Sequence, residues 1–262
     1  MIGCKPSTTP MIPRAHLHQD NNNPFDDPPA YRRLIGRLIY LTNTRPDITF
    51  CVNQLAQFMA CPTSFHHTAA MKVLRYLKAT PALGLFFPTH SVVQLKAYSD
   101  SDWASCPDTR RSVSGYCIYL GKSLVSWKSK KQRTVSRSSY EAEYRALTLT
   151  TCHITWLNYI LEDLQYKHFM PTLLYCDNQS AIYLASNPVF HERTKHIEIH
   201  CHTIKEKCSQ GLIKLLPILT HLQLADALTK TLGPAIYKNI HTKLGLLSIC
   251  APTCVGRGIK IK

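Results

Sequence analysis

The feature that most constrains the fold of this chain is a change in the spacing of its apolar residues near Pro81. Between residues 31 and 79, apolar side chains recur every three or four positions, which is the period of an amphipathic helix. Beyond Pro81 the period shortens, and short apolar runs typical of strands alternate with longer runs at helical spacing. The chain is therefore expected to combine a helical region with an α/β region that follows it.

The helical region is preceded by a segment that is unsuited to a core. Residues 1–27 are rich in proline and contain three consecutive asparagines, so we expect an extended linker. Residues 28–90 are expected to form a small helical subdomain of three helices. The second helix follows the break at Pro46, and the third follows Pro62 with Ser64 as its N-cap.

The α/β region is expected to form a mixed sheet flanked by helices. Its predicted order is three strands, a helix, a strand, a helix, a strand and a final helix. The predicted strands cover residues 95–100, 115–120, 124–127, 172–176 and 212–216, and the predicted helices cover residues 139–164, 178–185 and 222–230. From Pro234 onward the sequence is basic and shows no obvious pattern, so we expect a tail without regular structure.

The net charge is the part of the composition that bears most directly on function. The chain has 31 Lys and Arg residues against 16 Asp and Glu, a formal charge of +15 with histidine neutral. Such an excess is typical of proteins that bind polyanions, and nucleic acid is the partner we expect, with a solubilising basic surface as the alternative. No apolar run approaches the roughly 20 residues that cross a bilayer, so we expect a soluble protein without a membrane partner. The 11 cysteines are scattered, and we expect reduced thiols.

Acidic residues beside apolar ones mark the candidate site, and two of them lie at the end of the first predicted strand. Asp100 and Asp102 are two residues apart, so their side chains point to the same face of that strand. Either could be a functional carboxylate, and the alternative for the pair is an acidic residue that caps a turn.

Two glutamates near the start of the long predicted helix can be separated by helix geometry. Ser138 and Glu141 have the spacing of a capping box, in which Glu141 binds a free backbone amide. Glu143 instead begins the most apolar stripe of the helix, where a carboxylate suffers desolvation unless a cation lies beside it. We therefore prefer Glu143 over Glu141 as a candidate metal ligand.

Two further carboxylates complete the candidate set. Asp177 follows an apolar strand at the carboxyl edge of the sheet, where α/β folds place ligands, although an N-cap of the next helix is the alternative. Asp226 lies on the last predicted helix, where helix polarity alone would tolerate it. Together these positions suggest a site for two divalent hard cations, which can support in-line displacement at phosphorus.

Seven segments resemble consecutive blocks from the end of the Pol polyproteins of copia-type LTR retrotransposons. These segments are YRRLIGRLIYLTNTRPDI, MKVLRYLKATPALGLFF, AYSDSDWASCPDTRRSVSGYCIYLG, SWKSKKQRTVSRSSYEAEYRAL, YCDNQSAIYLASNP, HERTKHIEI and LADALTK. They keep their order and spacing over roughly residues 3–233, which makes the resemblance specific. No Tyr-x-Asp-Asp motif of a polymerase occurs, so DNA synthesis by this chain alone is not expected.

The resemblance implies a ribonuclease H-like fold, a five-stranded mixed sheet flanked by helices, over residues 91–233. It implies that residues 28–90 are a thumb or connection remnant of the reverse transcriptase and that residues 234–262 are a basic tail. The implied activity is hydrolysis of the RNA strand of RNA:DNA hybrids, with a separate polymerase domain as a further partner. The implied location is the cytoplasm, in a retroelement particle, or the nucleus, and not the secretory pathway.

The same resemblance assigns the site residues. It places the catalytic and metal-binding tetrad on Asp100, Glu143, Asp177 and Asp226, with two Mg²⁺ ions as cofactors and Mn²⁺ as a substitute. Only the resemblance selects Asp100 over Asp102. The candidates for contact with the hybrid backbone, with a solvated charge run as the alternative, are Lys128, Lys130, Lys131, Arg133, Arg137, Arg193, Lys195 and His196.

Two departures from the family pattern support an alternative function. His200 stands where related sequences usually have Asp, and Ser105 stands where Gly is usual. A truncated remnant that binds nucleic acid without turnover is therefore a second hypothesis. An integrase or transposase catalytic domain is a third, but it does not account for Glu143 on an early long helix followed by Asp177 at the next strand end.

Overall fold

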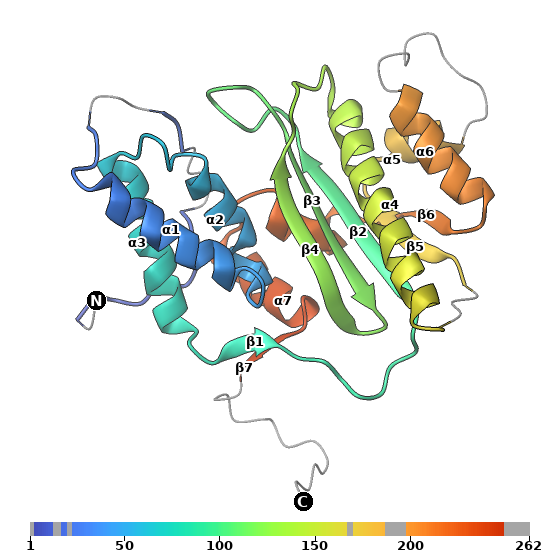
Figure 1. Ribbon diagram of the computed structural model, residues 1–262, viewed down its shortest axis with the longest axis horizontal. Coiled ribbons are helices and arrows are strands. Elements are labelled where there is room, and N and C mark those ends of the chain that lie inside the picture. The colour runs from blue at the N-terminus through green and yellow to red at the C-terminus, as the bar shows by residue number, and fades with distance from the viewer. Residues whose placement is uncertain (1–2, 13–16, 20–22, 167–169, 187–197, 249–262) are drawn as a thin grey trace, which may run out of the picture.

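The computed structural model describes residues 3–12, 17–19, 23–166, 170–186 and 198–248. It places a helical subdomain beside an α/β domain (Figure 1). The fold class implied by the resemblance, a ribonuclease H-like α/β fold with a five-stranded mixed sheet flanked by helices, is confirmed. Among the described residues, no helix is both long and apolar enough to cross a membrane.

The helical subdomain consists of α1 (Pro28–Leu41), a short 3₁₀ helix (Pro46–Ile48), α2 (Thr49–Ala56) and α3 (Ser64–Ala79). The expectation that Ser64 caps α3 is wrong, because Thr63 is the N-cap. Its hydroxyl accepts the amide of His66, and the His66 ring reaches back to the Thr63 amide, so the two residues form a reciprocal capping box.

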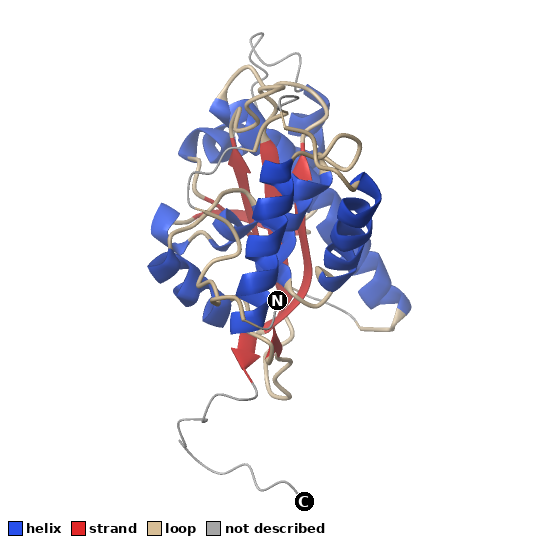
Figure 2. Ribbon diagram, turned by 90° about the vertical axis from the view of Figure 1, so that its left-hand side faces the viewer, coloured by secondary structure: helices blue, strands red, loops and turns tan. Residues whose placement is uncertain are grey.

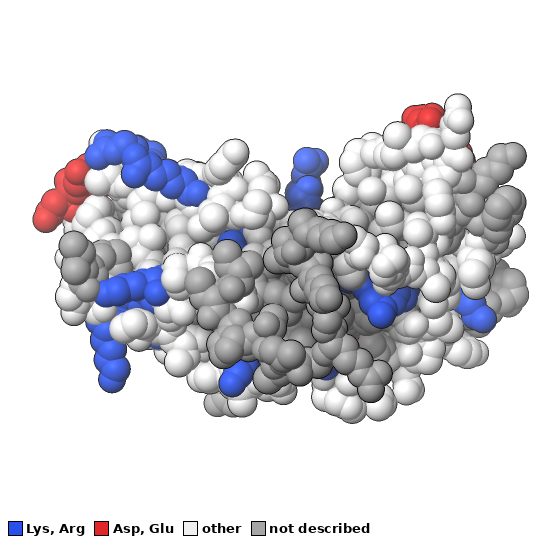
Figure 3. All heavy atoms as spheres, turned by 90° about the horizontal axis from the view of Figure 1, so that it is seen from below, with Lys and Arg blue, Asp and Glu red and all other residues white. Residues whose placement is uncertain are grey.

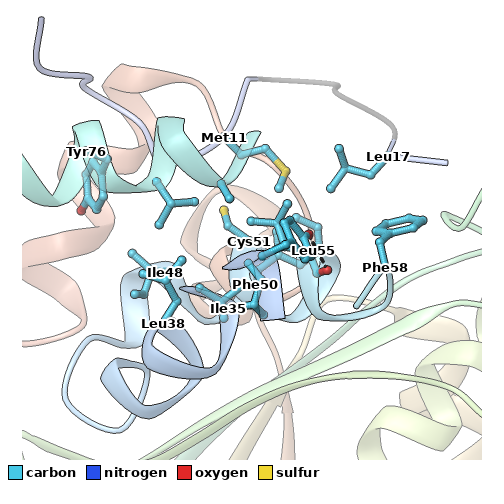
Figure 4. Close-up of a cluster of buried hydrophobic side chains, with 14 of the residues drawn as sticks. Met11, Leu17, Ile35, Leu38, Ile48, Phe50, Cys51, Leu55, Phe58 and Tyr76 are labelled. Carbon is cyan, nitrogen blue, oxygen red and sulfur yellow. Dashed lines mark hydrogen bonds between the residues drawn. The ribbon is translucent and has the colours of Figure 1, made fainter. Parts of the chain in front are cut away.

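The apolar faces of these helices form one core, and the segment expected to be a linker contributes to it (Figure 4). Met11 and Leu17 are 5% and 6% exposed within this core. The Ser7 amide also donates to the backbone oxygen of Arg75 on α3. The described part of residues 1–27 lacks helices and strands, as expected, but it packs on the subdomain because its few apolar residues are buried.

The sheet of the α/β domain has the strand order β4-β3-β2-β5-β6. The strands are β2 (Leu95–Asp102), β3 (Val113–Leu120), β4 (Ser123–Lys131), β5 (Thr172–Cys176) and β6 (Ile213–Pro217). The β2–β3 and β3–β4 pairs are antiparallel, while β2–β5 and β5–β6 are parallel. This arrangement puts the carboxyl ends of β2 and β5 at the same edge of the sheet.

Helices cover both faces of the sheet (Figure 2). The alternation of β3 shows the division: Tyr116 and Ile118 pack towards α4 (Ser139–Asp163), whereas Cys117 and Tyr119 pack in a separate cluster with the C-terminal elements. On the same side of the sheet lie α5 (Gln179–Ser186) and α6 (Glu198–Ser209), both of which contact α4. Helix α6 was not predicted from the sequence.

The prediction of an unstructured tail after Pro234 is wrong for residues 234–248. They form α7 (Pro234–Lys243) and β7 (Leu246–Ser248), and β7 pairs antiparallel with β1 (Leu83–Leu85). The physical reason is a buried set of apolar residues at helical spacing, Tyr237, Ile240 and Leu244. The proposed domain boundaries stay a prediction.

The helix predicted over residues 222–230 is also wrong. The chain forms two short 3₁₀ helices there, η3 (Thr220–Leu222) and η4 (Leu224–Leu228). Gln223 separates them: its side-chain amide donates to the backbone oxygen of Ser99, and its side-chain oxygen accepts the amide of Ala225. These contacts tie the turn to β2 and replace regular α-helical geometry.

Candidate active site

Four carboxylates from four different elements lie near the carboxyl edge of β2 and β5. Asp100 is on β2 and Glu143 is in the second turn of α4, and they are only 2% and 6% exposed. Asp177 follows β5, and Asp226 lies on η4. Burial and the charges of Asp100 and Asp177 raise the pKa of both Glu143 and Asp226. The structure therefore brings together all four predicted tetrad residues.

The structure separates the two glutamates of α4. Glu141 accepts hydrogen bonds from the Arg137 amide at 2.8 Å and from the Arg145 guanidinium at 2.7 Å. Ser138 is the N-cap, as predicted, and its hydroxyl accepts the Glu141 amide. Glu143 points to the sheet, where one of its oxygens accepts the Ser101 amide at 3.1 Å. Glu141 thus has structural partners, and Glu143 faces the carboxylate cluster.

The structure also bears on the alternative that Asp177 is a helix cap. The side-chain oxygen of Asn178 accepts the amide of Ala181 at 2.9 Å, and the Asn178 backbone oxygen accepts the amide of Ile182. Asn178 therefore provides the first hydrogen bonds of α5. This leaves the Asp177 carboxylate available to the cluster.

Crowding and burial make the charged forms of two of these carboxylates costly. Burial, together with the charges of Asp100 and Asp177, raises the pKa of Glu143 well above its ordinary value. Burial and the Asp100 charge raise the pKa of Asp226 to about 7, although Lys230 opposes the shift. The second oxygen of Glu143 is buried and has no hydrogen-bond partner. A cation among these oxygens would relieve both penalties.

The ammonium group of Lys230 is one positive charge beside these carboxylates. This ammonium lies 2.9 Å from Asp226 Oδ1 and 3.6 Å from Asp100 Oδ2. Burial lowers the pKa of Lys230, but the charges of Asp100 and Asp226 outweigh it and raise the pKa above its ordinary value. The Thr229 hydroxyl also donates to Asp100. A set of carboxylate oxygens that includes the buried, unsatisfied Oε2 of Glu143 fits a hard divalent cation.

The sequence argument missed Lys230, Thr229 and Gly115. The spacing of four residues between Asp226 and Lys230 is a signal for their ion pair. Gly115 pairs with Asp100 across β2 and β3, and η4 lies directly against it. No spacing rule could have revealed that contact, because residues 115 and 229 are far apart in the sequence.

Substituting Gly115 with Ala is expected to displace η4. An added Cβ would lie 2.7 Å from Thr229 Cγ2 and 2.9 Å from Leu228 Cβ, so the turn that carries Asp226 must move away from Asp100. We expect a loss of about 1–3 kcal/mol in the free energy of unfolding and weaker divalent-cation binding. Urea denaturation and metal titration measure the two effects.

The matched control is Gly36→Ala on the exposed side of α1, where an added Cβ meets nothing within 4 Å. It is expected to be neutral or to stabilise by up to about 1 kcal/mol, since Ala favours helices. A Gly115→Ala variant with unchanged stability and cation affinity would contradict this account of η4.

Replacing Lys230 with Gln is expected to make the protein depend more strongly on divalent cations for stability. Without the ammonium, Asp100 and Asp226 repel each other, so the Tm in a chelator should fall. The rise in Tm on adding Mg²⁺ should be larger than in the parent protein, because ligand binding stabilises the folded state. Lys122→Gln in the exposed β3–β4 turn is the control. An equal or smaller Mg²⁺ effect in Lys230→Gln would count against the prediction.

The basic residues predicted to contact nucleic acid do not form one surface. Lys128 and Lys130 pair with Tyr116 and Ser114 and therefore lie on the α4 face of β4. Lys131 points to the opposite face, where its ammonium donates to Gln57 Oε1 and Cys106 Sγ, each at 2.9 Å. Arg133 and Arg137 follow β4 and are exposed, while Arg193, Lys195 and His196 lie outside the described residues.

Comparison with known proteins gives relatives over almost the whole chain. The chain is 44% identical over 249 residues to a retrovirus-related Pol polyprotein from transposon RE1 of Arabidopsis thaliana, covering 95% of this chain and 17% of that protein. It is 36% identical over 239 residues to the Pol polyprotein from transposon TNT 1-94 of Nicotiana tabacum, covering 88% of this chain and 18% of the relative. The chain thus spans less than a fifth of the length of these relatives.

Comparisons with protein-family models and with solved structures give weaker results than the sequence relatives. No protein-family model matches the chain. Among solved structures, the ribonuclease H1 named LC11, isolated from compost, is 16% identical with a TM-score of 0.42, covering 53% of this chain and 94% of that chain. The assignment to a family rests on the sequence relatives. The chain belongs to the retrovirus-related Pol polyproteins of copia-type transposons, of which it represents a part.

Proposed function

We propose that the α/β domain is a ribonuclease H, a metal-dependent endonuclease that hydrolyses the RNA strand of RNA:DNA hybrids during reverse transcription. The observation that carries the proposal is the convergence of four carboxylates, of which Glu143 has a buried oxygen without a hydrogen-bond partner. The relatives, which are named as Pol polyproteins of transposons, support a role in this process.

In this proposal Asp100, Glu143, Asp177 and Asp226 hold two Mg²⁺ ions, with Mn²⁺ as a substitute. The bound ions supply an activated water and charge stabilisation for in-line displacement at phosphorus. The protein's own contribution is position: Ser101 orients Glu143 through its amide, and Thr229 orients Asp100 through its hydroxyl. Lys230 balances the charge of Asp100 and Asp226 until the cations bind.

The excess of basic residues would hold the polyanionic substrate around this acidic centre. On the face seen from below, Lys and Arg side chains lie in several separate places and acidic ones are few (Figure 3). Among the described candidates, the exposed ones are Lys128, Lys130, Arg133 and Arg137, and Arg193, Lys195 and His196 stay candidates. Lys131 is a weaker candidate because it has partners within the protein.

The test is cleavage of a hybrid that carries separate labels on its two strands. With Mg²⁺, we expect the RNA strand to be cut and the DNA strand to stay intact, while double-stranded DNA and double-stranded RNA of the same sequence are not cut. Binding of the hybrid without any cleavage would contradict the proposal and favour the remnant that only binds nucleic acid. A chelator control must abolish cleavage without abolishing the fold.

A further inference from the structure

A thiol lies within the candidate active site and has no role in the proposed hydrolysis. Cys176 is the last residue of β5 and is fully buried. Its Sγ, one oxygen of Glu143 and one oxygen of Asp177 all lie within 4.8 Å of one another. Sγ accepts the amide of Asn178 at 3.4 Å, which fixes the sulfur at the carboxyl end of the strand. Cys176 is a free thiol.

A second observation concerns the same group of three residues: one of its carboxylate oxygens is buried and unsatisfied. Glu143 is 6% exposed, and its Oε2 is buried without a hydrogen-bond partner. A buried carboxylate oxygen without a donor is costly, and a bound cation is one way to satisfy it. The carboxyl group that carries this unsatisfied oxygen also has an oxygen within 4.8 Å of the Cys176 sulfur, so one soft and two hard ligand atoms lie close together.

The chemistry of these three ligands differs from that of an all-oxygen site. Mg²⁺ binds oxygen and does not take thiolate ligands. Zn²⁺ takes sulfur at about 2.3 Å and carboxylate oxygen at about 2.0–2.2 Å, so adjacent ligand atoms of a tetrahedral site lie roughly 3.5 Å apart. Side-chain movement of about 1 Å would bring the three atoms to that spacing. The thiol proton passes to solvent when the metal binds.

We propose that Glu143, Cys176 and Asp177 form a thiophilic metal site that takes Zn²⁺ and stops hydrolysis. Zn²⁺ held by Cys176 would engage two of the four carboxylates, so it excludes the ions that need the same oxygens. The inhibition rests on the proposed ribonuclease function, whereas the binding itself does not. Because thiolate is a soft ligand, Zn²⁺ should displace Mg²⁺ at far lower concentration than Mg²⁺ displaces Zn²⁺.

Cobalt titration tests the site without any need for activity. Co²⁺ replaces Zn²⁺ in such sites and gives a thiolate-to-metal charge-transfer absorption. We expect this absorption in the parent protein and in Cys152→Ser, where an exposed α4 cysteine is removed, and its loss in Cys176→Ser. Addition of Zn²⁺ should abolish it and excess Mg²⁺ should not. Absorption that persists unchanged in Cys176→Ser would overturn the proposal, as would its absence from the parent protein.

Inhibition of hybrid cleavage gives the second measurement. For each variant, the Zn²⁺ concentration that halves its own Mg²⁺-dependent rate is determined. Loss of residues that merely support metal ligands costs about 10–100-fold in affinity, so loss of the sulfur ligand should raise this concentration by more than about 100-fold. Cys152→Ser should match the parent protein, and equal inhibition of Cys176→Ser would overturn the inhibitory role.

The two measurements separate this inference from the proposed function. A cobalt signal that depends on Cys176 in a protein that cuts no hybrid supports the metal site and contradicts the ribonuclease. Hybrid cleavage without that cobalt signal supports the ribonuclease and contradicts the metal site. Cys176→Ala provides a second variant if Cys176→Ser does not fold, since it removes the sulfur and places no hydroxyl in the buried position.

Discussion

The Glu143→Gln variant is expected to lose at least about 100-fold in the rate of hybrid cleavage, because a metal-site carboxylate contributes several kcal/mol to the transition state. The stability of the same variant is expected to increase. Glu143 is buried beside Asp100 and Asp177, so the neutral amide removes a repulsion and should raise the Tm in the absence of divalent cations. Single-turnover cleavage and thermal unfolding in a chelator measure the two effects.

Glu141→Gln is the matched control, two residues earlier on the same helix. Glu141 binds the Arg137 amide and the Arg145 guanidinium, so its loss should cost about 1–3 kcal/mol of stability. Cleavage at a temperature where the variant is folded should stay within a few-fold of the parent rate. If Glu143→Gln cleaves normally, or if Glu141→Gln alone abolishes cleavage, the roles of the two glutamates are assigned wrongly.

The Asp47→Ala variant is expected to lose about 3–5 kcal/mol of unfolding free energy, which is the cost of leaving a buried charge without its partner. Arg45 and Asp47 are 5% and 1% exposed, and the guanidinium lies 2.7 Å from Asp47 Oδ2. The Tyr76 hydroxyl donates to the same carboxylate. Removal of the carboxylate therefore leaves the buried guanidinium without its anionic partner, although Thr80 still accepts from it, and it removes one of the hydrogen-bond partners of the phenol.

This network also joins the helical subdomain to α7. The Tyr76 hydroxyl lies 2.9 Å from His241 Nε2, and the Tyr237 hydroxyl donates to the Asp47 backbone oxygen. Urea denaturation measures the loss in Asp47→Ala, with Asp26→Ala at an exposed position as the control, expected within about 0.5 kcal/mol. A double variant with Arg45→Met should recover part of the loss, since it removes the unpaired charge. A loss below about 1 kcal/mol in Asp47→Ala would contradict this account.

Much of the sheet was predictable because its apolar pattern is local. Residues 172–176 were predicted as a strand and form β5, and the helix predicted over residues 139–164 forms α4 with a difference of one residue at its end. The distinction between Glu141 and Glu143 was predictable for the same reason, since a capping box and an apolar stripe are set within one helix. Strand alternation could not choose between Asp100 and Asp102, which share a face.

The errors arise where distant parts of the chain decide the local structure. Helix α6 is polar around its buried Cys201 and Ile204, so its apolar pattern is weak. The turn at η4 depends on a hydrogen bond from Gln223 to β2 and on the close approach at Gly115. The basic run of β4 divides between two faces, because strand alternation turns Lys131 away from Lys128 and Lys130.

The measurement that tests the central claim most directly compares the parent protein with Asp177→Asn on a labelled RNA:DNA hybrid in Mg²⁺. Asn178, and not Asp177, caps α5, so the substitution should leave the fold intact. We predict Mg²⁺-dependent cleavage of the RNA strand by the parent and by Asp163→Asn, an exposed control at the end of α4, and loss of cleavage in Asp177→Asn. Equal cleavage by Asp177→Asn, or no cleavage by the parent, would contradict the assignment of the four-carboxylate cluster as a ribonuclease H active site.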